Sequence, residues 1–155
     1  MIATLILKVP VDASVEQTWL GATDWAGQGG WMLGTTVRTT HNNGQGVGGA
    51  ISAFTGVGRV GFVDPMTITL WEPPYRCHVL HTGKLVRGTG AFEVESAADG
   101  TAVFVWREDL VLPFGVLGRL GWLLLKPIFA YGVLVSLKRF ARWVPTRNYI
   151  EPTHP

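Results

Sequence analysis

Alternating apolar and polar positions fill most of the first two-thirds of the chain. Residues 3–11 are rich in β-branched and apolar side chains and predict a strand. The same pattern predicts six more strands, over 34–40, 50–55, 61–71, 75–83, 85–96 and 101–112. Turn sequences separate them, such as Asn42-Asn43-Gly44, Pro73-Pro74 and Ala98-Asp99-Gly100. Consecutive strands with no helical pattern between them predict an antiparallel meander.

Helical patterns flank this block of strands. Asp12 or Ser14 can cap a short helix over 15–21, with Gln17 three residues after Ser14 as a capping-box partner, and Asp24 opens a second short turn. A long helix is expected from about 116 to 144. On that helix Arg119 and Lys126 lie seven residues apart and so share a face, which is expected to face solvent. The opposite face would then pack against the sheet, and its residues are Leu117, Gly121, Leu124, Ile128 and Val135.

The order of elements predicts an α+β fold of one domain over residues 1–144. Its seven-stranded curved antiparallel sheet would wrap around the long C-terminal helix, with two short helices beside it. Residues 145–155 contain three prolines and few apolar side chains, which predicts a loose tail.

The apolar run from Leu120 to Leu137 is long enough to suggest a membrane span. Lys126 near its middle and Pro127 beside it favour a buried amphipathic helix instead. Transient contact with a membrane surface stays open, because the last helical turns and the tail carry a basic cluster of Lys138, Arg139, Arg142 and Arg147. The N-terminal segment lacks a basic region before its apolar run, so we expect a cytoplasmic protein.

Composition narrows the class of function. Apolar residues make up 47% of the 155 residues and charged residues 15%, which excludes intrinsic disorder as the main state. A net charge of +2 is too small for a nucleic-acid binder. A single cysteine, Cys77, excludes an intramolecular disulfide and a cysteine-based zinc site. No cofactor is predicted, and the sequence carries no signal for an oligomeric state.

Four short motifs occur in a particular order along the chain. They are Val9-Pro10-Val11-Asp12 leading to Trp19, then Thr23-Asp24-Trp25 with Trp31-Met32, then Trp71-Glu72-Pro73-Pro74-Tyr75-Arg76, and finally Phe104-Val105-Trp106-Arg107-Glu108. Over residues 3–144 this order resembles the helix-grip fold of the START-like superfamily, in particular its polyketide cyclase/dehydrase and lipid-transport (SRPBCC) branch. The resemblance implies a cavity between sheet and helix. It does not imply one activity, since the superfamily includes lipid carriers, hormone receptors and cyclases.

Two further patterns suggest chemistry that their context excludes. Residues 56–61 spell GxGxxG, but a strand follows instead of the helix that would hold a pyrophosphate, so we expect a hairpin. The histidines give no helical pair for a metal, and His78 and His81 face opposite sides of one strand, so no metal site is predicted. Cys77, in an apolar strand, is expected to be an inert buried thiol.

Strand alternation then identifies the side chains that face the cavity. The more apolar face of 75–83 carries Val79 and His81, and the more aromatic face of 102–112 carries Trp106 and Glu108. The charged residues Arg59, Asp64 and Arg87 are expected on solvated faces or strand ends. The expected ligand-binding set is Trp31, Phe54, Phe62, Val79, His81, Phe92, Trp106, Glu108, Leu124 and Ile128.

His81 and Glu108 form the sharpest pair of candidates. The leading hypothesis is binding or transport of a hydrophobic small molecule, a lipid, isoprenoid or polyketide-like compound, whose polar end these two groups orient. A polyketide cyclase/dehydratase, with His81 and Glu108 as base and acid, is an alternative. A membrane-surface protein acting through its basic C-terminal helix is another, and purely structural pairing of His81 with Glu108 also stays open.

Overall fold

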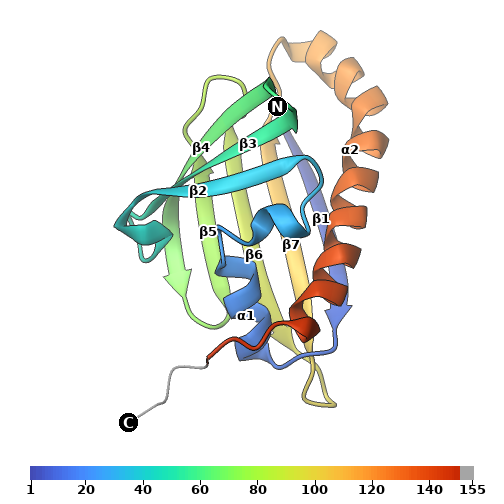
Figure 1. Cartoon of the computed structure of the whole chain (residues 1–155). Helices are drawn as coiled ribbons and strands as arrows, with labels where there is room; N and C mark the ends of the chain where they lie inside the picture. The colour runs from blue at the N-terminus through green and yellow to red at the C-terminus, as the bar shows by residue number, and fades with distance from the viewer. Residues whose placement is uncertain (151–155) are drawn as a thin grey trace.

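The computed structural model describes residues 1–150 and has the predicted α+β architecture (Figure 1). Its single antiparallel sheet has seven strands in the order β1-β7-β6-β5-β4-β3-β2. The strands are β1 (Ile2–Val11), β2 (Thr35–His41), β3 (Ala50–Val57), β4 (Val60–Glu72), β5 (Arg76–His81), β6 (Gly88–Ser96) and β7 (Ala102–Val111). Strands β2 to β7 follow one another as a meander, and β1 pairs with β7. The predicted meander is confirmed.

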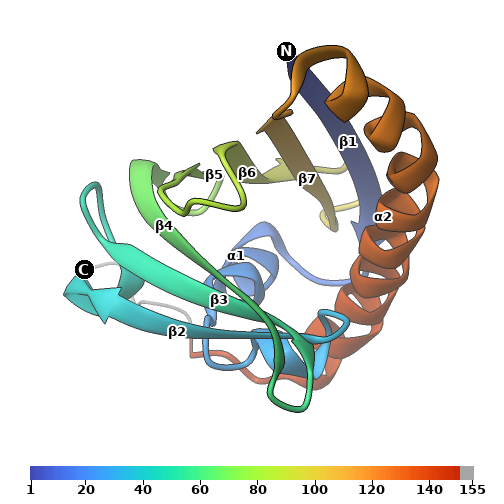
Figure 2. The same ribbon diagram turned by 90° about the horizontal axis from the view of Figure 1, so that it is seen from above.

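Two α-helices complete the domain: α1 (Val15–Thr23) and α2 (Gly115–Trp143). The Ser14 side chain accepts a hydrogen bond from the Gln17 backbone N–H (3.1 Å), so the predicted helix cap is present. The second short helix is only a 3₁₀ turn and lies later than expected, at Gln28–Gly30. Figure 2 shows the sheet curving around α1, with α2 covering the open side between β1 and β2.

The densest part of the core lies where α1 and the C-terminal half of α2 meet the sheet. Trp31, Phe104 and Phe140 are completely buried there, and the Phe140 ring centroid lies 4.8 Å from that of Trp31 and 4.5 Å from that of Phe104. Burying such side chains contributes roughly 2–3 kcal/mol each. This cluster closes one end of the molecule and fixes α2 to it.

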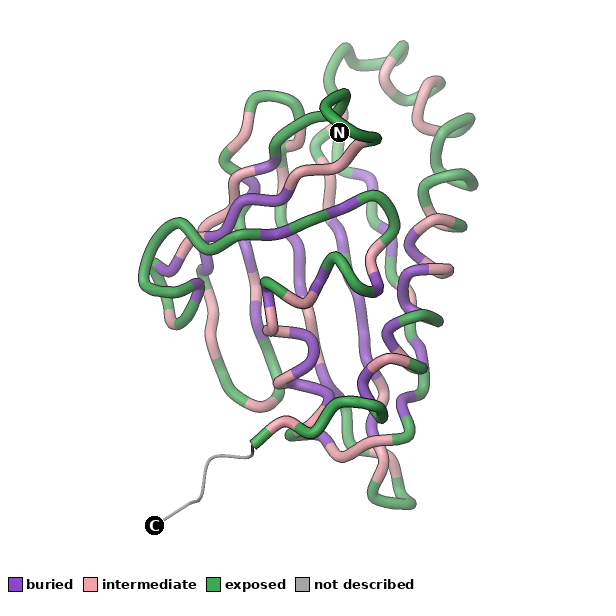
Figure 3. The backbone as a smooth tube through the Cα atoms, viewed as in Figure 1, coloured by how far each residue is buried: buried purple, intermediate pink, exposed green. Residues whose placement is uncertain are grey.

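The N-terminal half of α2 is exposed, which corrects the prediction of a buried helix (Figure 3). Leu117, Leu124 and Ile128 are 75%, 76% and 70% exposed instead of facing inward. The register of α2 is set by its buried C-terminal side chains, which include Val133 and Leu137. Residues seven apart share a face of a helix, so Lys126 lies on the same face as Val133, the face that packs against the domain further along the helix. Leu124 and Ile128 lie on the opposite face.

By length and mean hydropathy (1.7), the helical segment 115–146 is able to cross a membrane, and only 17% of its most apolar 18-residue window is buried. Its C-terminal half nevertheless packs into the core through Val133, Ser136, Leu137 and Phe140. Pro127 lies inside this one continuous helix.

The segment after α2 packs against α1, so the prediction of a loose tail is wrong for Tyr149. Gln17 Nε2 donates a hydrogen bond to the Tyr149 carbonyl oxygen (2.9 Å), and the Tyr149 hydroxyl donates to Asp24 Oδ2 (3.1 Å). The Arg147 guanidinium stacks 4.5 Å over the Trp143 ring. Residues 151–155, the rest of the predicted tail and the site of His154, lie outside the described residues.

Candidate functional site

A cavity of about 380 Å³ lies between the inner face of the sheet, α2 and the turn that precedes β2. Its size is in the range that holds a small organic molecule. Most of its wall is apolar, and most of the few polar groups lie at two places. The wall is formed by Trp25, Gln28, Met32, Leu33, Thr35, Val37, Ile51, Ala53, Thr55, Phe62, Asp64, Met66, Cys77, Val79, His81, Val86, Gly90, Ala91, Phe92, Trp106, Glu108, Leu110, Phe129, Gly132, Val133 and Ser136.

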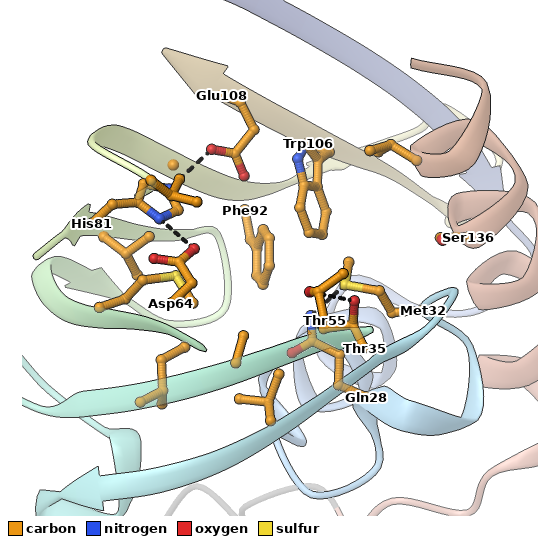
Figure 4. A pocket seen from close by; sticks show the side chains of 18 of the residues that line it. Gln28, Met32, Thr35, Thr55, Asp64, His81, Phe92, Trp106, Glu108 and Ser136 are labelled. Atoms are coloured by element: carbon orange, nitrogen blue, oxygen red, sulfur yellow. Dashed lines mark hydrogen bonds and ion pairs between the residues drawn. The ribbon is translucent and has the colours of Figure 1, made fainter. Parts of the chain in front are cut away.

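The principal polar group is a row of three side chains from three strands, which we call the carboxylate–histidine cluster: Asp64 on β4, His81 on β5 and Glu108 on β7 (Figure 4). His81 Nδ1 lies 2.8 Å from Asp64 Oδ2, and His81 Nε2 lies 3.1 Å from Glu108 Oε2. Each of the three residues is less than 10% exposed. The imidazole is therefore held at both nitrogens by carboxyl groups.

The strand pleat explains why these side chains meet. His81 pairs in register with Met66 on β4 and with Gly88 on β6, and Gly90 on β6 pairs with Glu108 on β7. Alternate residues of a strand share a face, so Asp64 lies beside Met66 on the inner side. Asp64 is thus a diagonal neighbour of His81 on the adjacent strand, whereas Glu108 reaches His81 across the intervening β6, where Gly90 has no side chain.

The surroundings shift the protonation of His81 and Glu108. Burial alone would lower the pKa of His81, but the hydrogen bonds and negative charges of Asp64 and Glu108 outweigh it and raise that pKa to about 9. Burial also raises the pKa of Glu108, against the opposing effect of His81. At neutral pH His81 is accordingly an imidazolium that donates to both carboxyl groups, and Glu108 is a stronger base than an exposed carboxylate.

Two buried acceptors in the cavity wall find no hydrogen-bond partner within residues 1–150. They are the second Asp64 oxygen, Oδ1, and the Gln28 side-chain oxygen, Oε1. A buried acceptor without a partner costs about 1–3 kcal/mol, so such groups in a cavity mark places where a ligand donor fits.

A second polar place lies across the cavity from the cluster, as Figure 4 shows. Thr35 Oγ1 and Thr55 Oγ1 are 2.9 Å apart, and Gln28 Nε2 contacts Met32 Sδ at 3.5 Å. Two further polar groups of the wall are the Ser136 hydroxyl on α2 and the Trp106 indole Nε1, and the rest of the wall is apolar.

Gly90 leaves the room that the Glu108 carboxyl group occupies. A Cβ at position 90 would lie 3.3 Å from both Glu108 carboxylate oxygens and 3.1 Å from Val79 Cγ2. These contacts are tighter than ordinary van der Waals spacing, so a side chain here would push Glu108 or narrow the cavity.

The structure brings together six of the ten residues expected to bind a ligand. Phe62, Val79, His81, Phe92, Trp106 and Glu108 all line the cavity. Trp31 is instead fully buried in the core, with its ring 6.4 Å from that of Trp106. Leu124 and Ile128 are exposed, for the reason given above.

Phe54 lies outside the cavity because β3 presents the opposite face to it. Ile51, Ala53 and Thr55 line the wall, and the residue between the last two must point away from it. The Phe54 ring covers Gly61 on the outer face, where a Cβ would lie 2.7 Å from Phe54 Cζ.

Asp64 was expected on a solvated face and is instead buried in the site. A signal in the sequence could have identified it, because Asp64 is two residues after Phe62 and so shares its face. The inner face of β4 is hard to assign from the sequence because Pro65 interrupts the strand pattern and because the β4–β5 register shifts at a bulge between Ile68 and Leu70.

Three other expectations can be compared with the structure. Residues 56–61 form the β3–β4 hairpin, with Gly58 at φ +59°. A hairpin was predicted here because a strand follows the GxGxxG pattern instead of the helix that a nucleotide site needs. His78 faces away from His81 and bonds Glu93 (3.1 Å). Cys77 is buried, and burial raises the pKa of its thiol to about 12, which agrees with an unreactive side chain.

No protein-family model matches the chain, and no curated protein sequence matches it. Solved structures do match over nearly its whole length. The Zhui aromatase/cyclase from Streptomyces sp. R1128 superposes with a TM-score of 0.75 and 15% identity, covering 95% of this chain and 96% of that one. A protein of Thermus thermophilus gives 0.73 and 15%, covering 93% and 98%.

The di-domain ARO/CYC StfQ from the steffimycin biosynthetic pathway gives a TM-score of 0.73 at 10% identity, covering 95% of this chain and 52% of that one. At such identities the likeness shows the fold. The chain thus has the helix-grip fold that these aromatase/cyclases have, and the resemblance seen in its sequence motifs is supported at the level of fold.

Proposed function

We propose that this protein binds or carries a small, mainly hydrophobic molecule in its cavity, with a polar group of that molecule at the carboxylate–histidine cluster. The observation that carries the proposal is a buried row of Asp64, His81 and Glu108 in the wall of an otherwise apolar cavity of about 380 Å³. Apolar burial supplies affinity, and the polar groups fix orientation.

The chemistry of the wall narrows the class of ligand. Within residues 1–150, Asp64 Oδ1 and Gln28 Oε1 are acceptors without partners and Trp106 Nε1 is a donor without one, so a ligand with hydroxyl or amide donors at two positions and an acceptor near Trp106 fits better than a plain acyl chain. The aromatic rings of Trp25, Phe92 and Trp106 favour a flat or ring-containing body. A polyketide-like or isoprenoid compound meets both conditions.

Binding is tested with N-phenyl-1-naphthylamine, a neutral aromatic probe whose fluorescence rises on entering an apolar site. Val79→Trp fills the cavity from β5 and should abolish the rise. Leu80→Trp, on the opposite and exposed face of the same strand, is the matched control and should leave it unchanged. Native mass spectrometry and organic extraction of the purified protein would identify any bound compound.

Equal fluorescence of the wild type and a folded Val79→Trp protein would overturn the proposal. Ala53→Leu, which enters the same cavity from β3, serves if Val79→Trp does not fold.

The cluster also favours a second function, proton transfer of the cyclase or dehydratase kind. Glu108 would take a proton from the carbon next to a ligand carbonyl. The His81 imidazolium would give its Nε2 proton to the departing hydroxyl group, which leaves as water while the carbon–carbon double bond forms. The proton on Glu108 would then return to His81 across their 3.1 Å hydrogen bond. The raised pKa values favour His81 as the acid and Glu108 as the base, the reverse of the roles expected from the sequence.

This second function is tested by hydrogen–deuterium exchange at the carbon next to the carbonyl of 2-tetralone, followed by NMR. The wild type should accelerate exchange over buffer, and Glu108→Gln should remove the acceleration while N-phenyl-1-naphthylamine still binds. No acceleration by the wild type, with probe binding intact, would exclude proton transfer and leave the binding function standing.

A further inference from the structure

We propose that the rim of the cavity mouth is a docking surface for a membrane that contains anionic lipids. The rim consists of three segments: the β3–β4 hairpin (56–63), the β5–β6 loop (82–88) and the start of α2 with the residues before it (112–120). In Figure 1 all three lie at the same, upper end of the molecule, and Figure 2 looks down on that end.

The cavity reaches the surface towards this end. Phe62 of the hairpin strand lines the cavity and is 37% exposed, and Phe129, halfway along α2, lines it and is 36% exposed. Val86 of the β5–β6 loop and Leu110, near the end of β7, complete this part of the wall. A molecule entering or leaving here passes between the rim segments.

Each rim segment presents large apolar side chains to solvent. Val57 and Val60 at the hairpin tip are 86% and 82% exposed, Leu85 in the loop is 70% exposed, and Phe114 and Leu117 at the start of α2 are 83% and 75% exposed. A soluble protein rarely exposes so many apolar side chains around one opening without a partner for them. They project from turns and a helix end and so form separate tips, which suits insertion into a fluid interface more than contact with a flat protein face.

The charge of the rim selects the kind of surface. Arg59, Lys84 and Arg87 are exposed beside these apolar tips, and Arg119 follows on α2. Segments 56–63, 82–88 and 112–135 contain no Asp or Glu. Within residues 1–150 no ion pair involves Arg59, Lys84 or Arg87. Two copies meeting rim to rim would bring like charges together, whereas an anionic lipid surface complements both the cations and the apolar tips.

The surface lies apart from the basic cluster that the sequence suggested. Lys138, Arg139 and Arg142 lie on the last turns of α2, which pack at the closed end of the molecule in Figure 1. Docking through the rim instead places the cavity mouth against the lipid, so a hydrophobic ligand moves between bilayer and cavity without crossing water. That last step rests on the proposed binding function, and the docking itself does not.

Vesicle flotation tests the proposal, with the purified full chain and vesicles of phosphatidylcholine alone or with 30% phosphatidylglycerol. The wild type should float with the anionic vesicles at low salt and less so as salt rises. Neutralising Arg59, Lys84 and Arg87 to Gln should lower partitioning roughly a hundredfold, at about fivefold for each cation near the surface. Neutralising Lys138, Arg139 and Arg142 to Gln is the charge-matched control and should change it little.

The apolar contribution is tested with the double variant Val60→Glu and Leu117→Glu, whose positions are exposed enough to leave folding intact. It should lose vesicle binding, and Tyr75→Glu, exposed in the β4–β5 turn, should not. No flotation at low salt would overturn the proposal, as would loss only in the Lys138/Arg139/Arg142 variant. A dimer or a captured acidic protein that the rim variants disrupt, without vesicle binding, would also overturn it. N-phenyl-1-naphthylamine binding, measured without vesicles, reports separately on the cavity.

Discussion

His81 Nδ1 and Asp64 Oδ2 lie 2.8 Å apart, although Asp64 is not the residue paired with His81 across the β4–β5 ladder. The paired residue is Met66, so the hydrogen bond joins diagonal neighbours on the inner face of the sheet. The bond uses the nitrogen that points away from Glu108, and it leaves Nε2 for the second carboxyl group. Asp64 therefore fixes which nitrogen of His81 meets Glu108.

Replacing Asp64 with Asn should lower the pKa of His81 from about 9 toward or below its ordinary value of 6.5. The substitution removes one negative charge beside the ring and leaves the burial that opposes protonation. NMR titration of the imidazole ring signals measures the change. The ring signals of His78, which bonds Glu93 on the outer face, provide the internal control for effects that do not arise at the cluster. An unchanged His81 titration would contradict the assigned role of Asp64.

Stability should fall as pH rises from about 6.5 to about 9. His81 has a higher pKa in the folded state than in the unfolded chain, so its stabilising contribution is complete below pH 6.5 and is lost as pH passes through 9. The difference between the two pKa values corresponds to roughly 3 kcal/mol. The pKa of Glu108 is also raised in the folded state, so protonation of Glu108 stabilises the fold as well. This contribution is lost as pH rises above the ordinary glutamate pKa of 4.5.

Urea unfolding at several pH values between 6 and 8 measures this loss, because Cys77, whose thiol pKa is raised from 9.0 to about 12 by burial, adds a loss of its own only as pH approaches 9. In His81→Gln the slope of unfolding free energy against pH should largely disappear between 6.5 and 8. A slope equal to that of the wild type would assign the pH dependence to other groups.

Gly90→Ala should weaken N-phenyl-1-naphthylamine binding several-fold. The added methyl group would meet Val79 Cγ2 at 3.1 Å and both Glu108 carboxylate oxygens at 3.3 Å, so the wall must shift. Gly132→Ala is the matched control, because it also adds one methyl group to a residue of the cavity wall but meets nothing within 4 Å. Equal affinities of the two variants would show that the space at Gly90 is not limiting.

Trp31→Ala and Leu124→Ala should differ sharply in stability. Trp31 is fully buried against Phe104, Trp106 and Phe140, so its removal should cost about 3–5 kcal/mol. Leu124 is 76% exposed, so its truncation should change unfolding free energy by less than about 0.5 kcal/mol. Denaturant unfolding of both variants checks this. A large loss for Leu124→Ala would place the N-terminal half of α2 in the core after all.

Regular strands made two of the three cluster residues, His81 and Glu108, predictable from the sequence. On β5 and β7 one face is clearly more apolar, so simple alternation places His81 and Glu108 inward, and the sheet register brings them together. Prediction failed where the alternation is interrupted or ambiguous. Pro65 and the bulge near Ile68 obscure the inner face of β4, and with it Asp64.

The long helix was misread for a different reason. Its two early cations suggested a solvent face, but its orientation is fixed by contacts of its distant C-terminal half, such as Phe140 with Phe104. Such long-range packing is invisible in a local pattern of polar and apolar positions. The exposed side chains of Leu117 and Leu124 could not be foreseen from that pattern.

Anchoring α2 by its C-terminal half separates the part of the domain that stabilises the fold from the part that surrounds the cavity mouth. The buried contacts around Trp31, Phe104 and Phe140 belong to the first part, and Phe62 and Val86 in the cavity wall belong to the second. Under the proposed binding function, ligand preference can therefore change through substitutions near the mouth while the main stabilising contacts are retained.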